Sequence, residues 1–136
     1  MVTNKNVART KGFSLIELLV VMVILGLLAS LVGPVMFGKV DSSRVKAAET
    51  QIQMFGTALD TFRLDVGDYP DSLEELRRSS KSGWDGPYIP KEVPLDPWGN
   101  QYQYQKTNDR VVPYVITSLG KDGKIGGDND NADITN

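Results

Sequence analysis

The side chains of this sequence that are best suited to chemistry lie near its C-terminus, where several aspartates could bind a metal ion. Residues 118–134 contain carboxylates at Asp122, Asp128, Asp130 and Asp133, separated by glycines, asparagines and lysines. Carboxylate and carbonyl oxygens are the ligands that Ca²⁺ prefers, and glycines let the backbone curl around an ion. The segment therefore predicts a calcium-binding loop or, because it has few core-forming residues, a flexible polar tail.

The aspartates do not follow the EF-hand pattern. When the loop is counted from Asp128, with Asp130 at its third position, the sixth position must be glycine, but Asp133 occupies it. A calcium ion would therefore need a different arrangement of ligands in this segment.

The absence of two residue types limits the kinds of catalysis and metal binding that the chain could perform. The sequence has no histidine and no cysteine, so Ser-His and Cys-His nucleophile pairs, disulfides and Cys-ligated zinc are excluded. Its 136 residues suffice for one small domain. We therefore expect a protein that is not an enzyme. The alternative from another class, an anchored enzyme or binding module, would need a converging polar site in the globular part.

The charged residues are unevenly placed. Of 15 basic and 17 acidic residues, three basic ones, Lys5, Arg9 and Lys11, come before the first apolar run. The rest of the chain is therefore acidic, whereas a nucleic-acid partner requires a basic face. We expect no nucleic-acid binding.

An apolar run follows these basic residues. No side chain from Leu18 to Gly38 is charged, and at about 1.5 Å per residue this length crosses a hydrocarbon core of about 30 Å. The preceding positive charges favour a cytoplasmic N-terminus. Pro34, next to Gly33, predicts a kink or local melting of the helix.

The residues at the start of the run form a recognisable motif, which combines a basic residue, a glycine, a phenylalanine and an acid: Lys11-Gly12-Phe13-Ser14-Leu15-Ile16-Glu17. This motif resembles the class III signal of type IV pilins and type II secretion pseudopilins. The resemblance implies that a prepilin peptidase cuts between Gly12 and Phe13 and methylates the new amine of Phe13. Because the cut precedes the apolar run, the product would stay anchored in the membrane.

Glu17 is the one acid at the edge of this run, where lipid penalises an unpaired carboxylate by a few kcal/mol. The cut would create a positively charged amine on Phe13, and pairing with that amine on a neighbouring subunit would relieve the penalty. The alternative is that Glu17 simply lies at the membrane interface as a flanking residue.

The chain beyond the run predicts an α+β fold. Apolar residues recur every three or four positions, which places one stripe along a helix that begins near Phe13 and ends near Leu64. A short helix is expected at 72–76, and strands at 101–105 and 111–118 are expected to form a hairpin around Asn108-Asp109. The stripe consists of Val45, Ala48, Ile52, Phe55, Leu59 and Phe62.

Three further segments extend the resemblance over most of the chain: Tyr69-Pro70, Asp96-Pro97-Trp98-Gly99-Asn100 with the tyrosines that follow, and Ser118-Leu119-Gly120-Lys121-Asp122-Gly123. They resemble the major, G-type pseudopilins of type II secretion. The resemblance implies a pilin-like fold with a leader at 1–12, a transmembrane and assembly helix at 13–38, and a periplasmic globular domain at 39–136. It also implies an inner-membrane subunit that polymerises with copies of itself, minor pseudopilins and an assembly platform to extrude folded proteins.

The same resemblance implies a structural calcium site. By position, Leu119 would offer its carbonyl, and Asp122 and Asp133 their carboxylates. Some relatives have an acid where this chain has Ala132, so Asp130 or Asp128 would have to supply the missing ligand. The alternative function is a type IV pilin of a long surface fibre, although many such pilins have a disulfide that this chain cannot form.

Overall fold

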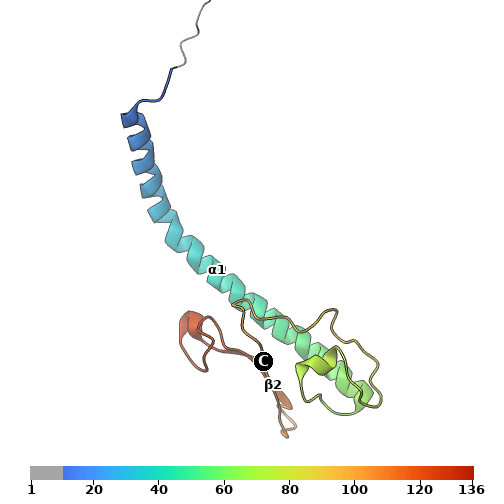
Figure 1. The fold of residues 1–136 in the computed structure, drawn as a ribbon. Coiled ribbons are helices and arrows are strands. Elements are labelled where there is room, and N and C mark those ends of the chain that lie inside the picture. Colours follow the sequence, from blue (N-terminus) through green and yellow to red (C-terminus); the bar gives the residue numbers. More distant parts are fainter. Residues whose placement is uncertain (1–10) are drawn as a thin grey trace, which may run out of the picture. The chain divides into compact units, whose positions relative to one another are not determined.

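The computed structural model describes residues 11–136, so the predicted leader lies outside the described residues except for Lys11 and Gly12. The chain divides into two compact units, Met1–Gly38 and Lys39–Asn136, and the boundary falls within the long helix. Figure 1 shows the elements in sequence colours. They are α1 (Leu15–Val66), η1 (Leu73–Leu76), β1 (Gln103–Lys106), β2 (Tyr114–Ser118), η2 (Asn129–Asn131) and β3 (Ile134–Thr135).

The first part of α1 is an exposed apolar helix. By length and composition α1 could cross a membrane, because an 18-residue window in it has a mean hydropathy of 2.9 and none of that window is buried. Large side chains such as Leu19, Leu27 and Leu31 are more than half exposed. A continuous apolar surface of this kind requires a lipid or protein partner.

α1 begins and ends two residues later than predicted, because a cap begins the helix after Ser14 and another ends it at Gly67. Gly67 has a φ of 95° and its N–H donates to the Arg63 carbonyl at 2.8 Å, which ends the helix. The backbone stays helical through Pro34. The local melting expected there is therefore not found, and a change of helix direction at Pro34 stays a prediction.

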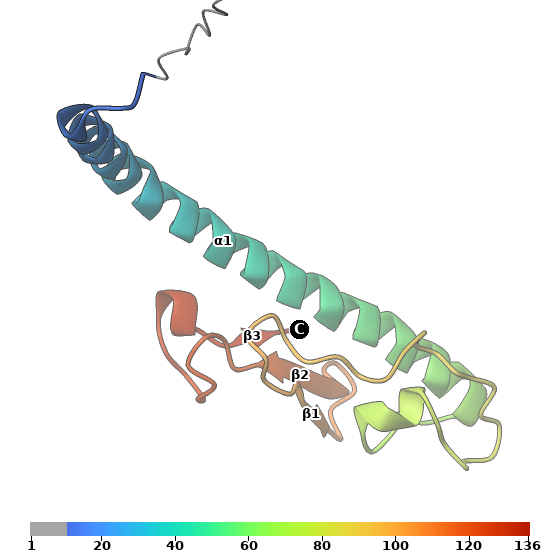
Figure 2. The same cartoon turned by 45° about the horizontal axis from the view of Figure 1, so that its top comes forward.

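The core of the second unit forms along the predicted apolar stripe. Every stripe residue is buried except Val45, which is partly exposed, and Ala58 joins them. Figure 2 shows the sheet lying alongside this part of α1. Phe55 meets Tyr102 edge to face at a ring distance of 5.2 Å, and the side chain of Ile116 is fully buried in the same cluster. The helix and the sheet therefore share one hydrophobic core.

The sheet has three antiparallel strands in the order β1-β2-β3. The predicted hairpin is confirmed, with Gln103 opposite Thr117 and Lys106 opposite Tyr114. β1 begins two residues later than predicted and ends one residue later, and β2 begins three residues later than predicted. Residues 107–113 form the connection. The sequence analysis missed β3, whose two residues are too few to show an alternation.

The expected short helix at 72–76 is a 3₁₀ helix, η1, with Ser72 at its N-cap position. Ser72 makes no capping hydrogen bond through its side chain. Packing holds η1 instead, because Leu73 and Leu76 are buried in the core beside the helix.

We predict that Leu59→Ala lowers the free energy of unfolding by about 2–5 kcal/mol, because Leu59 is fully buried and its loss leaves a cavity. Leu64→Ala is the matched control on the same helix, since Leu64 is 84% exposed and its truncation should change stability by less than about 0.5 kcal/mol. Denaturant unfolding followed by tryptophan fluorescence measures both, because Trp84 and Trp98 both lie in the second unit. Equal effects would contradict the described core.

Candidate functional site

The predicted processing and assembly residues lie at the start of α1, where Ser14 and Glu17 form a capping box. The Ser14 N–H donates to Glu17 Oε2 at 3.0 Å, and the Glu17 N–H donates to Ser14 Oγ at 3.2 Å. The pattern Ser-x-x-Glu before an apolar run signals this arrangement, so the sequence could have revealed it. Phe13, just before the box, is 89% exposed.

The capping box gives Glu17 a role that the sequence analysis did not consider. Each of the first N–H groups of a helix lacks a partner within the helix, and a carboxylate there also interacts favourably with the helix dipole. Glu17 therefore stabilises its own helix whether or not it pairs with another subunit. The two roles are compatible, because a carboxylate has two oxygens and the box uses only Oε2.

The predicted metal ligands lie in the loop between β2 and β3. The strand register pairs Thr117 with Thr135 and Ser118 with Ile134. Leu119 and Asp133 are the loop residues next to the Ser118–Ile134 pair, one on each side of the loop. The two ends of the segment that seemed a flexible tail are therefore held together by the sheet.

Backbone contacts close this loop. The Lys121 N–H donates to the Asp130 carbonyl at 3.2 Å. Gly120 has a φ of 67°, and a Cβ there would lie 2.8 Å from the carbonyl oxygen of Ala132. Gly127, with a φ of 101°, would overlap the backbone of Asn131 in the same way. A side chain at either glycine would therefore push the two sides of the loop apart.

Asp133 has the environment most suited to binding a cation. Its Oδ2 accepts a hydrogen bond from the Gly126 N–H at 2.8 Å, whereas its Oδ1 is buried without a hydrogen-bond partner. A buried carboxylate oxygen without a partner is costly, and a bound cation would remove that cost. Within residues 11–136 the only other buried side-chain polar atom without a partner is Trp98 Nε1, whose N–H cannot ligate a cation.

The other predicted ligands are arranged less closely. Asp122 Oδ1 accepts from the Lys124 N–H at 3.1 Å, and the side chains of Asp128 and Asp130 are exposed. In the described part of the chain, no three acidic side chains converge closely enough to hold a metal ion by themselves. An ion in this loop would therefore need backbone carbonyls, such as that of Leu119, together with Asp133.

A turn outside the loop contains a residue whose importance the sequence analysis missed. Asp96 begins the Asp96-Pro97-Trp98-Gly99-Asn100 turn and is only 4% exposed. Its Oδ1 accepts hydrogen bonds from the N–H groups of Trp98 at 3.0 Å and Asn100 at 2.8 Å. Turns often begin with aspartate for this reason, but the burial of the carboxylate could not be read from the sequence.

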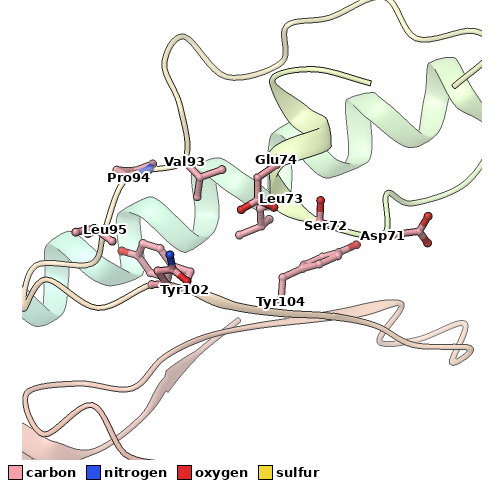
Figure 3. A pocket seen from close by; sticks show the side chains of 10 residues that line it. Asp71, Ser72, Leu73, Glu74, Val93, Pro94, Leu95, Tyr102 and Tyr104 are labelled. Atoms are coloured by element: carbon pink, nitrogen blue, oxygen red, sulfur yellow. The ribbon is translucent and has the colours of Figure 1, made fainter. Parts of the chain in front are cut away.

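One pocket of the second unit has a volume of about 240 Å³, and Figure 3 shows its tyrosines facing the side chains of η1 and Val93. Two of its hydroxyls are engaged, because Tyr102 donates to Gln51 Oε1 and Tyr104 to the Pro70 carbonyl at 2.8 Å. Lys81 Nζ lies 2.8 Å from Asp71 Oδ2, and the hydrogen bond between them holds the pKa of the Asp71 carboxyl below its usual value. The two tyrosine hydroxyls therefore link the start of the hairpin to α1 and to the turn at Pro70.

An exposed apolar helix, a capped start next to the predicted cleavage point and a small antiparallel sheet define the class of pilin-like, membrane-anchored subunits. Residues 35–136 match the family described as "Type II secretion system (T2SS), protein G", and residues 7–33 match the "Prokaryotic N-terminal methylation motif". The chain belongs to the type II secretion system protein G family.

Named relatives agree with this assignment. The chain is 40% identical to the type II secretion system core protein G of Pseudomonas aeruginosa, with 92% of this chain and 93% of the relative covered. It is 39% identical to that of Vibrio cholerae, with 97% and 94% covered. These relatives favour a pseudopilin over the alternative of a surface pilin.

A solved structure supports the fold. The crystal structure of the major pseudopilin from the type 2 secretion system of enterohaemorrhagic Escherichia coli superposes with a TM-score of 0.56 at 28% sequence identity. The match covers 74% of this chain and 91% of that one. The expected pilin-like α+β fold is therefore confirmed.

We expect Tyr102 and Tyr104 to make the folded state less stable at high pH. Burial raises the pKa of Tyr102 to about 12 and also raises that of Tyr104, whereas an unfolded tyrosine titrates near about 10. The folded state therefore keeps these protons longer, and its stability is fully present below about pH 10 and falls as the pH rises toward about 12.

We predict that Tyr102→Phe reduces this alkaline loss without abolishing it, because Tyr104 still contributes. At neutral pH the same variant should lose about 1 kcal/mol, since the hydrogen bond to Gln51 is removed. Unfolding curves measured between about pH 9 and about pH 12 test this. An unchanged pH dependence in the variant would show that Tyr102 is not its source.

Proposed function

We propose that this protein is a structural subunit of the type II secretion pseudopilus, which polymerises from the inner membrane and helps to move folded proteins across the outer membrane. One observation carries the proposal: the apolar first part of α1 is exposed, and most of it lies within residues 7–33, which match the methylation motif. The membership of the protein G family supports the secretion system as the setting.

The exposed helix supplies the driving force for assembly. Side chains such as Leu18, Met22 and Leu25 are accommodated in lipid, and they can leave it without a large cost only if copies of the same helix bury them. A contact between different faces of identical subunits repeats without closing and produces a helical fibre. The partners would therefore be other copies of this chain, minor pseudopilins and the inner-membrane assembly platform.

The N-terminal motif supplies processing and orientation. A prepilin peptidase would cut between Gly12 and Phe13, leaving Phe13 as a methylated amine at the start of the span. Basic residues before the span favour a cytoplasmic N-terminus and a periplasmic globular domain. In this proposal the subunit catalyses no reaction.

Glu17 would set the register between subunits through its charge. Its capping bond to Ser14 uses one carboxylate oxygen, so the other is free to pair with the Phe13 amine of a neighbour. Glutamine can also serve in a capping box, and Glu17→Gln therefore keeps the cap but removes the charge. This variant separates the two roles of the residue.

We predict that Glu17→Gln is still cleaved to a methylated Phe13 but assembles far fewer fibres than the wild type. Mass spectrometry of the membrane-extracted protein measures the cleavage, and electron microscopy together with a secretion assay measures the assembly. A wild-type chain with an intact Met1 would contradict the processing. Normal fibres from Glu17→Gln would contradict the charge pairing and leave only the capping role.

We also propose that the loop between β2 and β3 binds a structural Ca²⁺ ion. Asp133 and the Leu119 carbonyl would bind the ion. Asp122, and Asp130 or Asp128 in the place that Ala132 leaves without a carboxylate, would move toward the ion on binding, because these carboxylates do not converge without it in residues 11–136. The buried, unpartnered Oδ1 of Asp133 supports this proposal. The ion would supply positive charge to a loop that has almost no apolar side chains to hold it.

We predict that calcium at 100 times its Kd raises the free energy of unfolding by about 2.7 kcal/mol, because it binds only the folded loop. Asp133→Asn should lose most of this gain. Asp85→Asn, an exposed aspartate outside the loop, is the matched control and should keep it. Thermal unfolding with calcium or with chelator measures all three proteins, and an identical melting temperature of the wild type in both would show the calcium proposal to be wrong.

A further inference from the structure

Two hydrogen bonds connect one turn of the chain to the residues on either side of Leu119. The Ser118 hydroxyl donates to Asp96 Oδ2 at 2.7 Å, and Asn100 Nδ2 donates to the Gly120 carbonyl at 3.1 Å. Asp96 and Asn100 are the first and last residues of the same five-residue turn. Leu119 is therefore fixed from its two neighbours, although its own carbonyl takes no part in these bonds.

The turn that makes these bonds is closed without help from the loop. Asp96 Oδ1 accepts from the backbone of Trp98 and of Asn100, and the Asp96 N–H donates to the Asn100 carbonyl at 2.8 Å. Together with Ser118, the Asp96 carboxylate therefore has three donors, as a buried carboxylate requires. Its oxygens are occupied, so Asp96 is poorly placed to bind a cation itself.

The loop side of the contact is equally well ordered. Ser118 is fully buried and pairs with Ile134, the residue that follows Asp133. Asn100 reaches the loop at a second point, because a Cβ on Gly123 would lie 3.2 Å from Asn100 Oδ1. The turn therefore contacts the loop before and after its proposed ligands Leu119 and Asp122.

We propose that Asp96 and Asn100 are positioning residues for the calcium site: they orient the Leu119 carbonyl before the ion arrives and so raise the affinity of the loop. This inference rests on the calcium proposal above. Its physical basis is that a loop ordered in advance loses less conformational entropy when it binds. Side chains that orient metal ligands typically change affinity by about 10–100-fold when they are removed.

Asn100→Ala is the direct test, because it removes the side-chain bond to Gly120 and leaves the backbone bonds of the turn intact. Asn108→Ala makes the same chemical change at an exposed position in the hairpin connection and is the matched control. Calcium is titrated into the full-length chain in detergent micelles, with calorimetry giving Kd and tryptophan fluorescence giving the melting temperature with chelator.

We expect Asn100→Ala to weaken calcium binding by at least about tenfold, whereas Asn108→Ala keeps the wild-type Kd. A lower melting temperature in chelator together with a Kd within about twofold of the wild type would mean that Asn100 only stabilises the fold, and would overturn the proposal. If Asn100→Ala does not fold, Ser118→Ala is judged by the same criterion, since it removes the bond to Asp96.

The titration also separates this inference from the proposal beneath it. A wild-type chain that takes up no calcium overturns the metal site, and the positioning role with it. A wild-type chain that binds calcium, with equal Kd values for Asn100→Ala and Asn108→Ala, overturns the positioning role alone.

Discussion

The packing of the α1 stripe against the sheet is the contact on which the second unit depends. Ile52, Phe55, Leu59 and Phe62 are all at least 97% buried, and they meet Tyr102 and Ile116 from the hairpin and Leu73 and Leu76 from η1. Neither a hairpin of this size nor a four-residue 3₁₀ helix is stable alone in water. The turn at Asp96 and the loop after β2 are held in place only because this core fixes the strands between them.

The first unit meets the same physical constraint in another way. In the described part of the chain, no residue of its 18-residue apolar window is buried, so the hydrophobic effect acts mainly between molecules instead of within one. The capping box at Ser14 is important here, because the first N–H groups of a helix cannot count on water when they lie next to lipid. A polar residue at this place therefore has a local reason as well as the proposed reason between subunits.

Local signals in the sequence were sufficient for the helix and the hairpin. The spacing from Ala48 to Phe62 predicted the buried face of α1, and the alternation around Tyr102 predicted the first strand. Features that depend on distant partners could not be predicted in this way. Nothing near Ile134 in the sequence indicates that it pairs with Ser118, and nothing near Asp96 indicates that its carboxylate receives the hydroxyl of Ser118.

In the candidate sites, too, some features were indicated by the local sequence and others depend on distant partners. Glu17 and the aspartates were identified by residue type, but the unpartnered oxygen of Asp133 and the bonds from Asn100 required the folded chain. The capping box was an exception, since its pattern was present in the sequence and was overlooked in favour of a partner on another subunit.

The glycines of α1 have a mechanical consequence. A Cβ at Gly26, Gly33 or Gly38 would meet nothing within 4 Å, so no contact with another part of residues 11–136 requires glycine there. Each costs the helix about 0.5–1 kcal/mol relative to alanine, and Pro34 removes a backbone donor among them. α1 is therefore easiest to stretch at these residues. A residue that unwinds changes its rise along the chain from about 1.5 Å to about 3.3 Å. Under axial tension, the helix would extend here before its capped ends yield.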